Sequence, residues 1–586
     1  MKTFTRRFLA AVIAGSGLFC AGPAIAAEPM PTRAEHIATP GKNPASEDGS
    51  DSIVLNPANT GYQPAPELRW TGVGCSDAPK KVGCGHSFEI ATPLVFGLGT
   101  GLRLDYVQTP WTSGFPYNGY DYVWLTWALG WKISDMFAFG VSLERSYSVD
   151  SYLNGLFGVS AGLTFRPNTH FAFAAIAHDF NGPSTALLPP NGLPVLDQSY
   201  DFAAAFRPTG RRGLEIGLDL QYLQGSDQFI PRGTLQLDIP GVGRARGDLA
   251  AAHIPNDTRR GVVGSVGLEV YLDSFSAGGG LLFGSGLGDS SSVGEYGTVA
   301  ISGYHNGTGV PLPKKAVKIR IESTPDPREH IKLLQNLWYL ADDPRYSAVA
   351  LEMRTEPAAS LAHAEELADA IRVLQARGKK VLCSLEDNGA KALYVCANAD
   401  RVVINPAGGV RYAGIKSQYF YLAGLLSKLG IKADIVRISD HKSAPEQFTN
   451  DHASDVSRAD HEDLLREVEA VFNKNLANGR HMSEEKVRAI TKTGPFVASE
   501  ARANGLVDAY AFDDELDKVV GEMLGHDVKL SKFEDPPTMV QDTFGLRGKV
   551  GVLLVEGDMI DGRSAHVPIL DERLVGSYSI AEKIKD

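Results

Sequence analysis

The strongest constraint on this chain is a long series of segments, between about residues 88 and 305, in which apolar residues alternate with polar or small ones. In residues 157–165, phenylalanine, valine, alanine and leucine alternate with glycine, serine and threonine. The same alternation recurs in residues 214–221 and 266–273. A period of two residues places the apolar side chains on one face of a β-strand. The region therefore predicts an all-β meander.

About a dozen such segments follow one another, and no long helical pattern interrupts them, which favours closure into a barrel. A soluble sandwich would hide the apolar face inside, whereas a transmembrane barrel would turn it toward lipid. The tryptophans and tyrosines of residues 117–131 resemble an interfacial girdle, and the 62 glycines suit closely packed strands. We predict a β-barrel over residues 88–310 and favour the transmembrane form, with the sandwich as the alternative.

The N-terminus has the pattern of a secretory signal peptide. Basic residues at positions 2, 6 and 7 precede an apolar stretch at 8–19 and a small-residue cleavage site at 24–26. We expect residues 1–26 to be removed, with an uncleaved anchor helix as the alternative. After residue 30 no apolar run approaches the ~18 residues of a membrane-spanning helix. These features predict an exported protein of the outer membrane or cell envelope, with a periplasmic location as the alternative.

Residues 27–87 are rich in proline, alanine, asparagine and aspartate without lasting periodicity, which predicts a linker or a loosely ordered lead-in. Cys75 and Cys84 bracket a short polar loop in this region. Export to an oxidising compartment makes a disulfide between them plausible. A metal site that uses His86 is the alternative, but few further ligands lie nearby in the sequence, so we predict no metal.

From about residue 314 the pattern changes to strands that alternate with helices, which predicts a parallel α/β layer fold. We expect Cys383 and Cys396 to be buried small hydrophobes in this region, because both stand in apolar strings. The expected strands are 317–321, 348–353, 380–384 and 401–404, and the expected helices are 328–340, 362–376, 390–397 and 455–478.

A weak internal repeat follows the first α/β unit, which we place at residues 314–545. Residues 549–556 restate the strand at 317–322, and residues 579–585 restate the helix that ends near Asp342. A strand and part of a helix cannot build a core alone. We therefore interpret residues 546–586 as the start of an incomplete second repeat.

The α/β region also contains a collinear set of short motifs. They occupy residues 343–344, 348–351, 378–381, 393–395, 399–402, 426–431, 441–448 and 501–508. Together they resemble the signal peptide peptidase A family, also called protease IV, a group of exported or membrane-bound serine peptidases. The resemblance implies a Clp/crotonase-like fold, peptide substrates, no cofactor, and a homo-oligomer formed through the peptidase domain.

The resemblance also implies a Ser–Lys dyad and assigns the lysine to Lys442, within Lys-Ser-Ala-x-Glu-x-Phe at residues 442–448. In the long members of the family the first repeat holds the lysine and the second holds the serine. A catalytic lysine takes the proton of the serine only when it is neutral, so burial must lower its pKa from the usual ~10.4. Backbone N–H groups would then hold the oxyanion. Residues 439–441 depart from the family's usual Gly-x-Tyr.

The nucleophile is missing from the first repeat, where Ala390 stands at the position that would need a serine. Ser384 and Ser443 are the nearest hydroxyls, but neither has the small-residue setting of a nucleophile. The resemblance therefore places the serine beyond Asp586 and implies that the chain as given cannot cleave peptides.

Three functions follow from these observations. The first is an exported serine endopeptidase that hydrolyses signal peptides or other membrane-released peptides. The second is a non-catalytic barrel or scaffold protein with a degenerate peptidase domain, which Ala390 favours. The third is a crotonase-like enzyme acting on acyl-CoA, which export disfavours. A net charge of -12 and a pI near 5.7 argue against nucleic acid as a partner.

Overall fold

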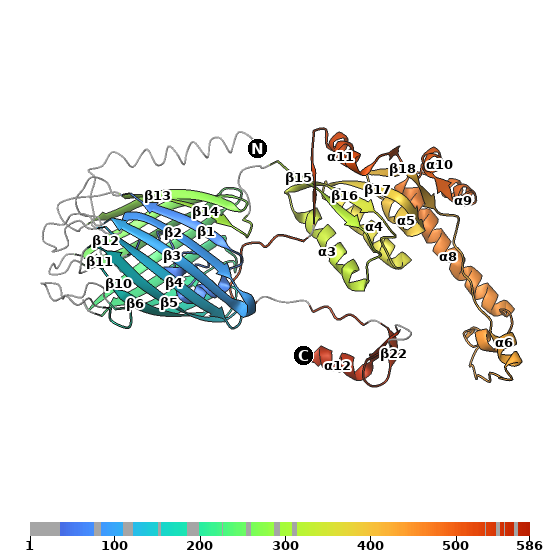
Figure 1. The fold of residues 1–586 in the computed structure, drawn as a ribbon, viewed down its shortest axis with the longest axis horizontal. Helices are drawn as coiled ribbons and strands as arrows, with labels where there is room; N and C mark the ends of the chain where they lie inside the picture. Colours follow the sequence, from blue (N-terminus) through green and yellow to red (C-terminus); the bar gives the residue numbers. More distant parts are fainter. Residues whose placement is uncertain are drawn as a thin grey trace. The chain divides into compact units, whose positions relative to one another are not determined.

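The computed structural model divides into two units, a β-barrel and an α/β unit (Figure 1). None of the helices described is both long and apolar enough to cross a membrane. The predicted signal peptide and Cys75 lie outside the described residues. The described residues are 36–74, 84–108, 121–149, 154–183, 198–224, 227–253, 260–285, 294–306, 313–533, 535–546, 551–555, 557–567 and 572–585.

Fourteen antiparallel strands form the first unit and close it as a barrel, because β1 pairs with both β2 and β14 (Figure 1). This confirms the predicted barrel. The strands are β1 (Glu67–Val73), β2 (Cys84–Pro93), β3 (Leu98–Gln108), β4 (Tyr122–Lys132), β5 (Phe137–Ser148), β6 (Phe157–Phe165), β7 (Phe171–His178), β8 (Ser199–Phe206), β9 (Leu214–Leu223), β10 (Gln228–Ile239), β11 (Gly243–His253), β12 (Arg260–Leu272), β13 (Phe275–Ser285) and β14 (Gly294–Ser302).

Strand β5 shows how the alternating sequence builds the wall of the barrel. Phe137, Phe139 and Leu143 are exposed on the outside, while Ser142 and Glu144 are buried inside. A sandwich would bury the phenylalanines instead. Apolar side chains outside and polar side chains inside are typical of barrels that reside in lipid. The barrel therefore indicates a membrane-associated location in the cell envelope.

The described part of residues 27–87, for which we predicted a linker or a loosely ordered lead-in, has defined structure instead. Residues 36–66 lie inside the barrel, where they form α2 (Ser52–Leu55) and the 3-10 helix η1 (Pro57–Tyr62). We call residues 36–66 the plug. The prediction was wrong because the irregular backbone of the plug is held by the barrel wall. For example, the Asn56 side chain donates to Thr164 Oγ1 on β6 at 2.8 Å.

Two glycines of the wall lie directly against the plug. A Cβ added to Gly99 on β3 would lie 1.9 Å from the carbonyl oxygen of Thr60. A Cβ added to Gly140 on β5 would lie 2.5 Å from the backbone of Pro57. Glycine is needed at such positions because another backbone occupies the space of a side chain. Part of the high glycine content therefore reflects the packing of the plug.

Charged side chains pair with one another inside the barrel. Arg103 is fully buried and contacts Glu89 at 2.9 Å and Asp105 at 2.8 Å. His36 of the plug lies between Asp105 at 2.7 Å and Glu144 at 3.0 Å. Buried charges are tolerated only when paired and hydrogen-bonded, so these contacts fix the plug against specific strands.

A segment from near the C-terminus also packs on the barrel. Met539 forms an isolated bridge with His305, and the Phe544 ring is fully buried. The guanidinium groups of Arg207 and Arg166 lie 3.6 and 5.2 Å from the centre of that ring. Residues 538–546 therefore belong to the barrel unit, which differs from the predicted end of the first peptidase repeat at residue 545.

The second unit is a seven-stranded sheet in the order β19-β18-β17-β16-β15-β21, with β20 beside β18, and most of its strands are parallel. It confirms the predicted α/β fold. The strands are β15 (Lys315–Ile321), β16 (Tyr346–Met353), β17 (Lys380–Gly389), β18 (Arg401–Arg411), β19 (Phe496–Val497), β20 (Ala509–Tyr510) and β21 (Leu530–Lys532).

Helices cover both faces of this sheet (Figure 1). Helices α3, α4, α5 and α8 share one apolar core with the strands, and α11 shares a second core on the opposite face. The helices are α3 (Pro327–Asp342), α4 (Leu361–Ala376), α5 (Ala390–Cys396), α6 (Ala423–Lys428), α7 (Glu446–Thr449), α8 (Asp455–Gly479), α9 (Glu484–Thr491), α10 (Ala498–Ala503), the 3-10 helix η3 (Asp513–Glu515) and α11 (Leu516–Leu524).

The region of the proposed second repeat contains β22 (Asp558–Ile560), β23 (Ala565–Val567), β24 (Glu572–Gly576) and α12 (Ser577–Lys585). Helix α12 agrees with the predicted helix at 579–585. The predicted strand at 549–556 was wrong over its described part, because residues 551–555 have no regular structure. Val552 and Val555 are exposed, and a strand forms only where a neighbouring strand accepts its hydrogen bonds.

Candidate active site

The segment that carries Lys442 lies between α6 and α8, and α6 lies near the end of α8 that projects from the sheet (Figure 1). Glu446 organises the segment. Its buried carboxylate accepts hydrogen bonds from Arg437 at 2.8 Å and from the Ser454 backbone N–H and hydroxyl at 3.0 and 2.8 Å. The Ser454 N–H, assisted by the Arg437 side chain, holds the pKa of Glu446 below its ordinary value. The glutamate of the motif therefore fixes the loop that follows Lys442.

Lys442 itself is exposed to solvent. Its backbone N–H donates to the carbonyl of Ser439 at 3.1 Å, and its ammonium group makes no hydrogen bond or ion pair with any residue that the structure describes. The neighbouring His441 turns to Asp460 on α8, with Nδ1 2.9 Å from the carboxylate. Within this single chain Lys442 therefore lacks the burial that a catalytic lysine needs.

Lys379 is a buried lysine in the same unit, and its environment differs from that of a catalytic base. Its ammonium group donates to the carbonyl oxygens of Asp343 at 2.6 Å and Tyr346 at 2.9 Å. Desolvation lowers the pKa of Lys379. Because two backbone carbonyls fix the group, we interpret Lys379 as a structural residue that ties β17 to the loop before β16.

The junction of β17 and α5 is the place where a first-repeat nucleophile would stand, and Ala390 occupies it. The backbone N–H groups of Gly389, Lys391 and Ala392 all donate to the carboxylate of Glu356, the last two at 3.1 and 3.2 Å. These donors resemble an oxyanion-binding group, but an internal carboxylate already occupies them. Sequence reasoning missed Glu356, because nothing in its local sequence connects it to this turn.

The other predicted site residues are separate from Lys442. Ser384 is buried in β17, and Ser443 is half-buried beside the lysine. Neither hydroxyl is hydrogen-bonded to the ammonium group of Lys442 among the contacts of the described residues. The structure thus brings no serine to this lysine within residues 313–533.

Cys383 and Cys396 are both fully buried, as predicted, but they form a disulfide that we did not predict. The bridge joins β17 to α5, with 5.4 Å between the Cα atoms. Both residues lie in apolar segments of the sequence. Their pairing could not be predicted because it depends on how α5 packs against β17. The Cys75–Cys84 bridge stays a prediction because Cys75 lies outside the described residues, and His86 stacks on Trp70 at 5.8 Å between ring centres.

Comparison with known proteins finds similar sequences for the α/β unit. Residues 373–525 match the family model described as Peptidase family S49. The chain is 24% identical over 261 residues to "Protease 4" of Haemophilus influenzae, covering 42% of this chain and 41% of that protein. It is 22% identical over 258 residues to "Protease 4" of Salmonella typhi, covering 42% of this chain and 40% of that protein. The chain therefore spans less than half the length of these relatives.

A third relative is "Serine protease SPPA, chloroplastic" of Arabidopsis thaliana, 23% identical over 195 residues, which are 33% of this chain and 28% of that protein. Among solved structures, a mutant of the "1510-N membrane-bound stomatin-specific protease" is 11% identical over 38% of this chain and all of that chain, with a TM-score of 0.26. The "CymD monoaromatic hydrocarbon channel" is 10% identical over 45% of this chain and 94% of that chain, with a TM-score of 0.33.

The fold defines a two-part protein in which a closed antiparallel β-barrel precedes an α/β unit, and that unit contains the residues that match the peptidase family model. The match to Peptidase family S49 over residues 373–525 and the similarity to these serine proteases agree with the resemblance seen in the sequence.

Proposed function

We propose that the chain belongs to a serine peptidase of the cell envelope in which Lys442 is the general base. The observation that carries this proposal is that the S49 match spans residues 373–525 and therefore includes the whole Lys442 motif. The substrates are signal peptides or other peptides released from membranes. The serine nucleophile belongs to the second repeat, beyond Asp586.

The chemistry divides between two repeats. Neutral Lys442 would take the proton from the serine hydroxyl as its oxygen attacks a peptide carbonyl, and the same lysine would pass a proton to the leaving amine. Water would then hydrolyse the acyl-enzyme. Ala390 and the carboxylate of Glu356 support this division, since they make the equivalent place of the first repeat unsuitable for an oxyanion.

The surface around Lys442 supports a homo-oligomer, formed through the peptidase domain. Val436 and Ile438 are 95% and 93% exposed, which is unusual for apolar side chains on a surface that stays in water. Further exposed apolar residues in the same part of the chain are Phe420, Leu425, Leu429, Ile431, Ile435, Phe448 and Leu464. Another copy of the peptidase domain that covered this surface would remove water from Lys442 and favour its neutral form.

The barrel supports a location in the outer membrane. Its apolar exterior suits lipid, and the signal-peptide pattern at residues 1–26 suits export. Peptides released at that membrane would be within reach of a peptidase that the barrel holds there.

The test uses the natural full-length protein, purified from outer membranes in detergent. Hydrolysis of fluorogenic peptides should fall by about 10²–10⁴ in Lys442→Ala, as expected for loss of a general base. Lys518→Ala, at an exposed lysine of α11 outside the apolar surface around Lys442, is the matched control and should leave the rate unchanged. Equal rates in Lys442→Ala and the parent would remove Lys442 from the mechanism.

A scaffold with a degenerate peptidase domain is the second candidate, and the occupied turn at Ala390 favours it. It predicts that the full-length protein hydrolyses no peptide and that no serine reacts with a fluorophosphonate probe. A labelled serine that requires Lys442 for its reactivity would exclude the scaffold.

A further inference from the structure

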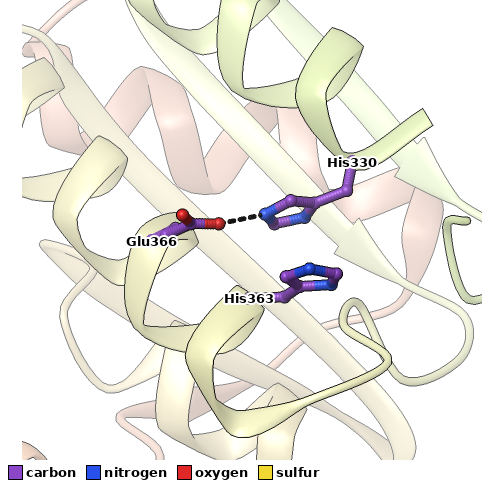
Figure 2. Close-up of side chains that lie close together, drawn as sticks. All are labelled: His330, His363 and Glu366. Atoms are coloured by element: carbon purple, nitrogen blue, oxygen red, sulfur yellow. Dashed lines mark hydrogen bonds and ion pairs between the residues drawn. The ribbon is translucent and has the colours of Figure 1, made fainter. Parts of the chain in front are cut away.

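Two histidines and a glutamate meet between α3 and α4, in a part of the peptidase domain that carries none of the Lys442 motif. His330 stands in the first turns of α3, and His363 and Glu366 lie three residues apart on α4 (Figure 2). Residues three apart in a helix share a face. The side chains of His363 and Glu366 therefore both lie on the face of α4 that meets His330 of α3.

Helix capping fixes the position of both histidines. Asp326 and Glu329 form a capping box at the start of α3, and Pro327 occupies its first turn. Ser360 caps α4 and accepts a hydrogen bond from the backbone N–H of His363 at 3.1 Å. Capped first turns hold their side chains in defined directions, so the histidines meet without the freedom of loop residues.

The three side chains are close enough to share one ion. His330 Nε2 lies 2.7 Å from a carboxylate oxygen of Glu366, and the two imidazole rings stack with 4.1 Å between their centres (Figure 2). One ligand atom from each of the three residues can be chosen so that all lie within 4.8 Å of one another. The Nδ1 atoms of both histidines are buried and have no hydrogen-bond partner among the described residues.

A purely structural role for the two histidines leaves their unpartnered Nδ1 atoms unexplained. His330 is only 2% exposed, and a buried imidazole nitrogen without a partner costs free energy.

The geometry points to a divalent transition-metal site formed by His330, His363 and Glu366, with Zn²⁺ as the ion of choice. Two imidazole nitrogens and one carboxylate suit Zn²⁺, whereas Mg²⁺ and Ca²⁺ prefer sets of oxygen ligands. Three protein ligands leave a fourth position for water. The Glu366 side chain is 56% exposed, so both the ion and that water can enter from solvent. The ion would join α3 to α4 independently of the proposed peptidase activity.

The experiment measures metal binding by the full chain in detergent, without a polyhistidine tag and after removal of metals with a chelator. Zn²⁺ is titrated against a competing dye, and Co²⁺ is used in parallel because its visible absorption reports tetrahedral coordination. We expect one equivalent of Zn²⁺ and a tetrahedral Co²⁺ spectrum. Fewer than one equivalent, or an octahedral Co²⁺ spectrum in the parent, would overturn the proposal.

Variants locate the site. Glu366→Gln and His363→Gln, which remove no helix cap, should each weaken Zn²⁺ binding by at least about tenfold, the smallest loss expected even for an outer-shell partner. Glu365→Gln changes the adjacent exposed glutamate of α4 and should bind as the parent does. Unchanged affinity in both Glu366→Gln and His363→Gln would assign the bound metal to other residues and reject this site.

Discussion

The contact between the barrel wall and the plug can be tested with a single methyl group at Gly140. A Cβ at this position would lie 2.5 Å from the backbone of Pro57 and 2.6 Å from that of Ala58, whereas ordinary contact begins at 3.4 Å. The obstructing atoms are backbone, so they cannot rotate away as a side chain would. Overpacking of this kind costs about 1–3 kcal/mol. We expect Gly140→Ala to shift η1 while the wall keeps its pairing between β4 and β5.

Hydrogen exchange followed by mass spectrometry measures this effect in the detergent-solubilised protein. A loss of about 1–3 kcal/mol corresponds to exchange that is about five- to 150-fold faster in the plug. Gly233→Ala is the matched control, because no described atom lies within 4 Å of a Cβ added to that glycine of β10. Unchanged exchange of residues 57–62 in Gly140→Ala, or an equal acceleration in Gly233→Ala, would refute the packing argument.

Three further predictions concern other parts of the chain. The pKa of Glu446 is lowered in the folded protein, so the ionised carboxylate stabilises the fold fully above its unfolded pKa of ~4.3. This stabilisation is lost as the pH falls through the folded pKa, so proteolysis of residues 437–458 should accelerate in acid. Glu446→Gln should make the proteolysis rate less dependent on pH. Phe544→Ala should cost about 3–5 kcal/mol of local stability, because the ring is fully buried beside Arg207, and protease cleavage within residues 538–546 should increase without loss of the barrel. Mass spectrometry of non-reduced digests should find Cys383 linked to Cys396 and Cys75 linked to Cys84; free thiols at either pair would contradict that bridge.

The barrel could be predicted from the sequence because its strands carry a local pattern, in which apolar residues alternate with small or polar ones. In β5 every outward residue from Phe137 to Leu143 is apolar, and every inward one is small or polar. The plug could not be predicted in this way. Its hydrogen bonds, such as that from Asn56 to Thr164, join residues far apart in the chain, and its sequence has no period to detect.

Some features of the candidate sites could likewise be predicted from the sequence, and others could not. The assignment of Lys442 stays a prediction, while Glu446 of the same motif is buried and accepts hydrogen bonds from Arg437 and Ser454. The exposure of Lys442 could not be predicted, because it depends on how the segment between α6 and α8 folds. Glu356 and the His330–His363 pair were missed because each depends on residues from separate elements, which only the folded sheet brings together.

The paired charges inside the barrel have a consequence for transport. A solute that passed through the interior of the barrel would have to displace the plug. It would also have to separate ion pairs such as Arg103 with Glu89 and His36 with Glu144. Removing one partner from a buried pair costs about 3–5 kcal/mol, and several pairs would have to open together. In the described part of the barrel, the plug and these ion pairs therefore oppose the passage of solutes through the interior.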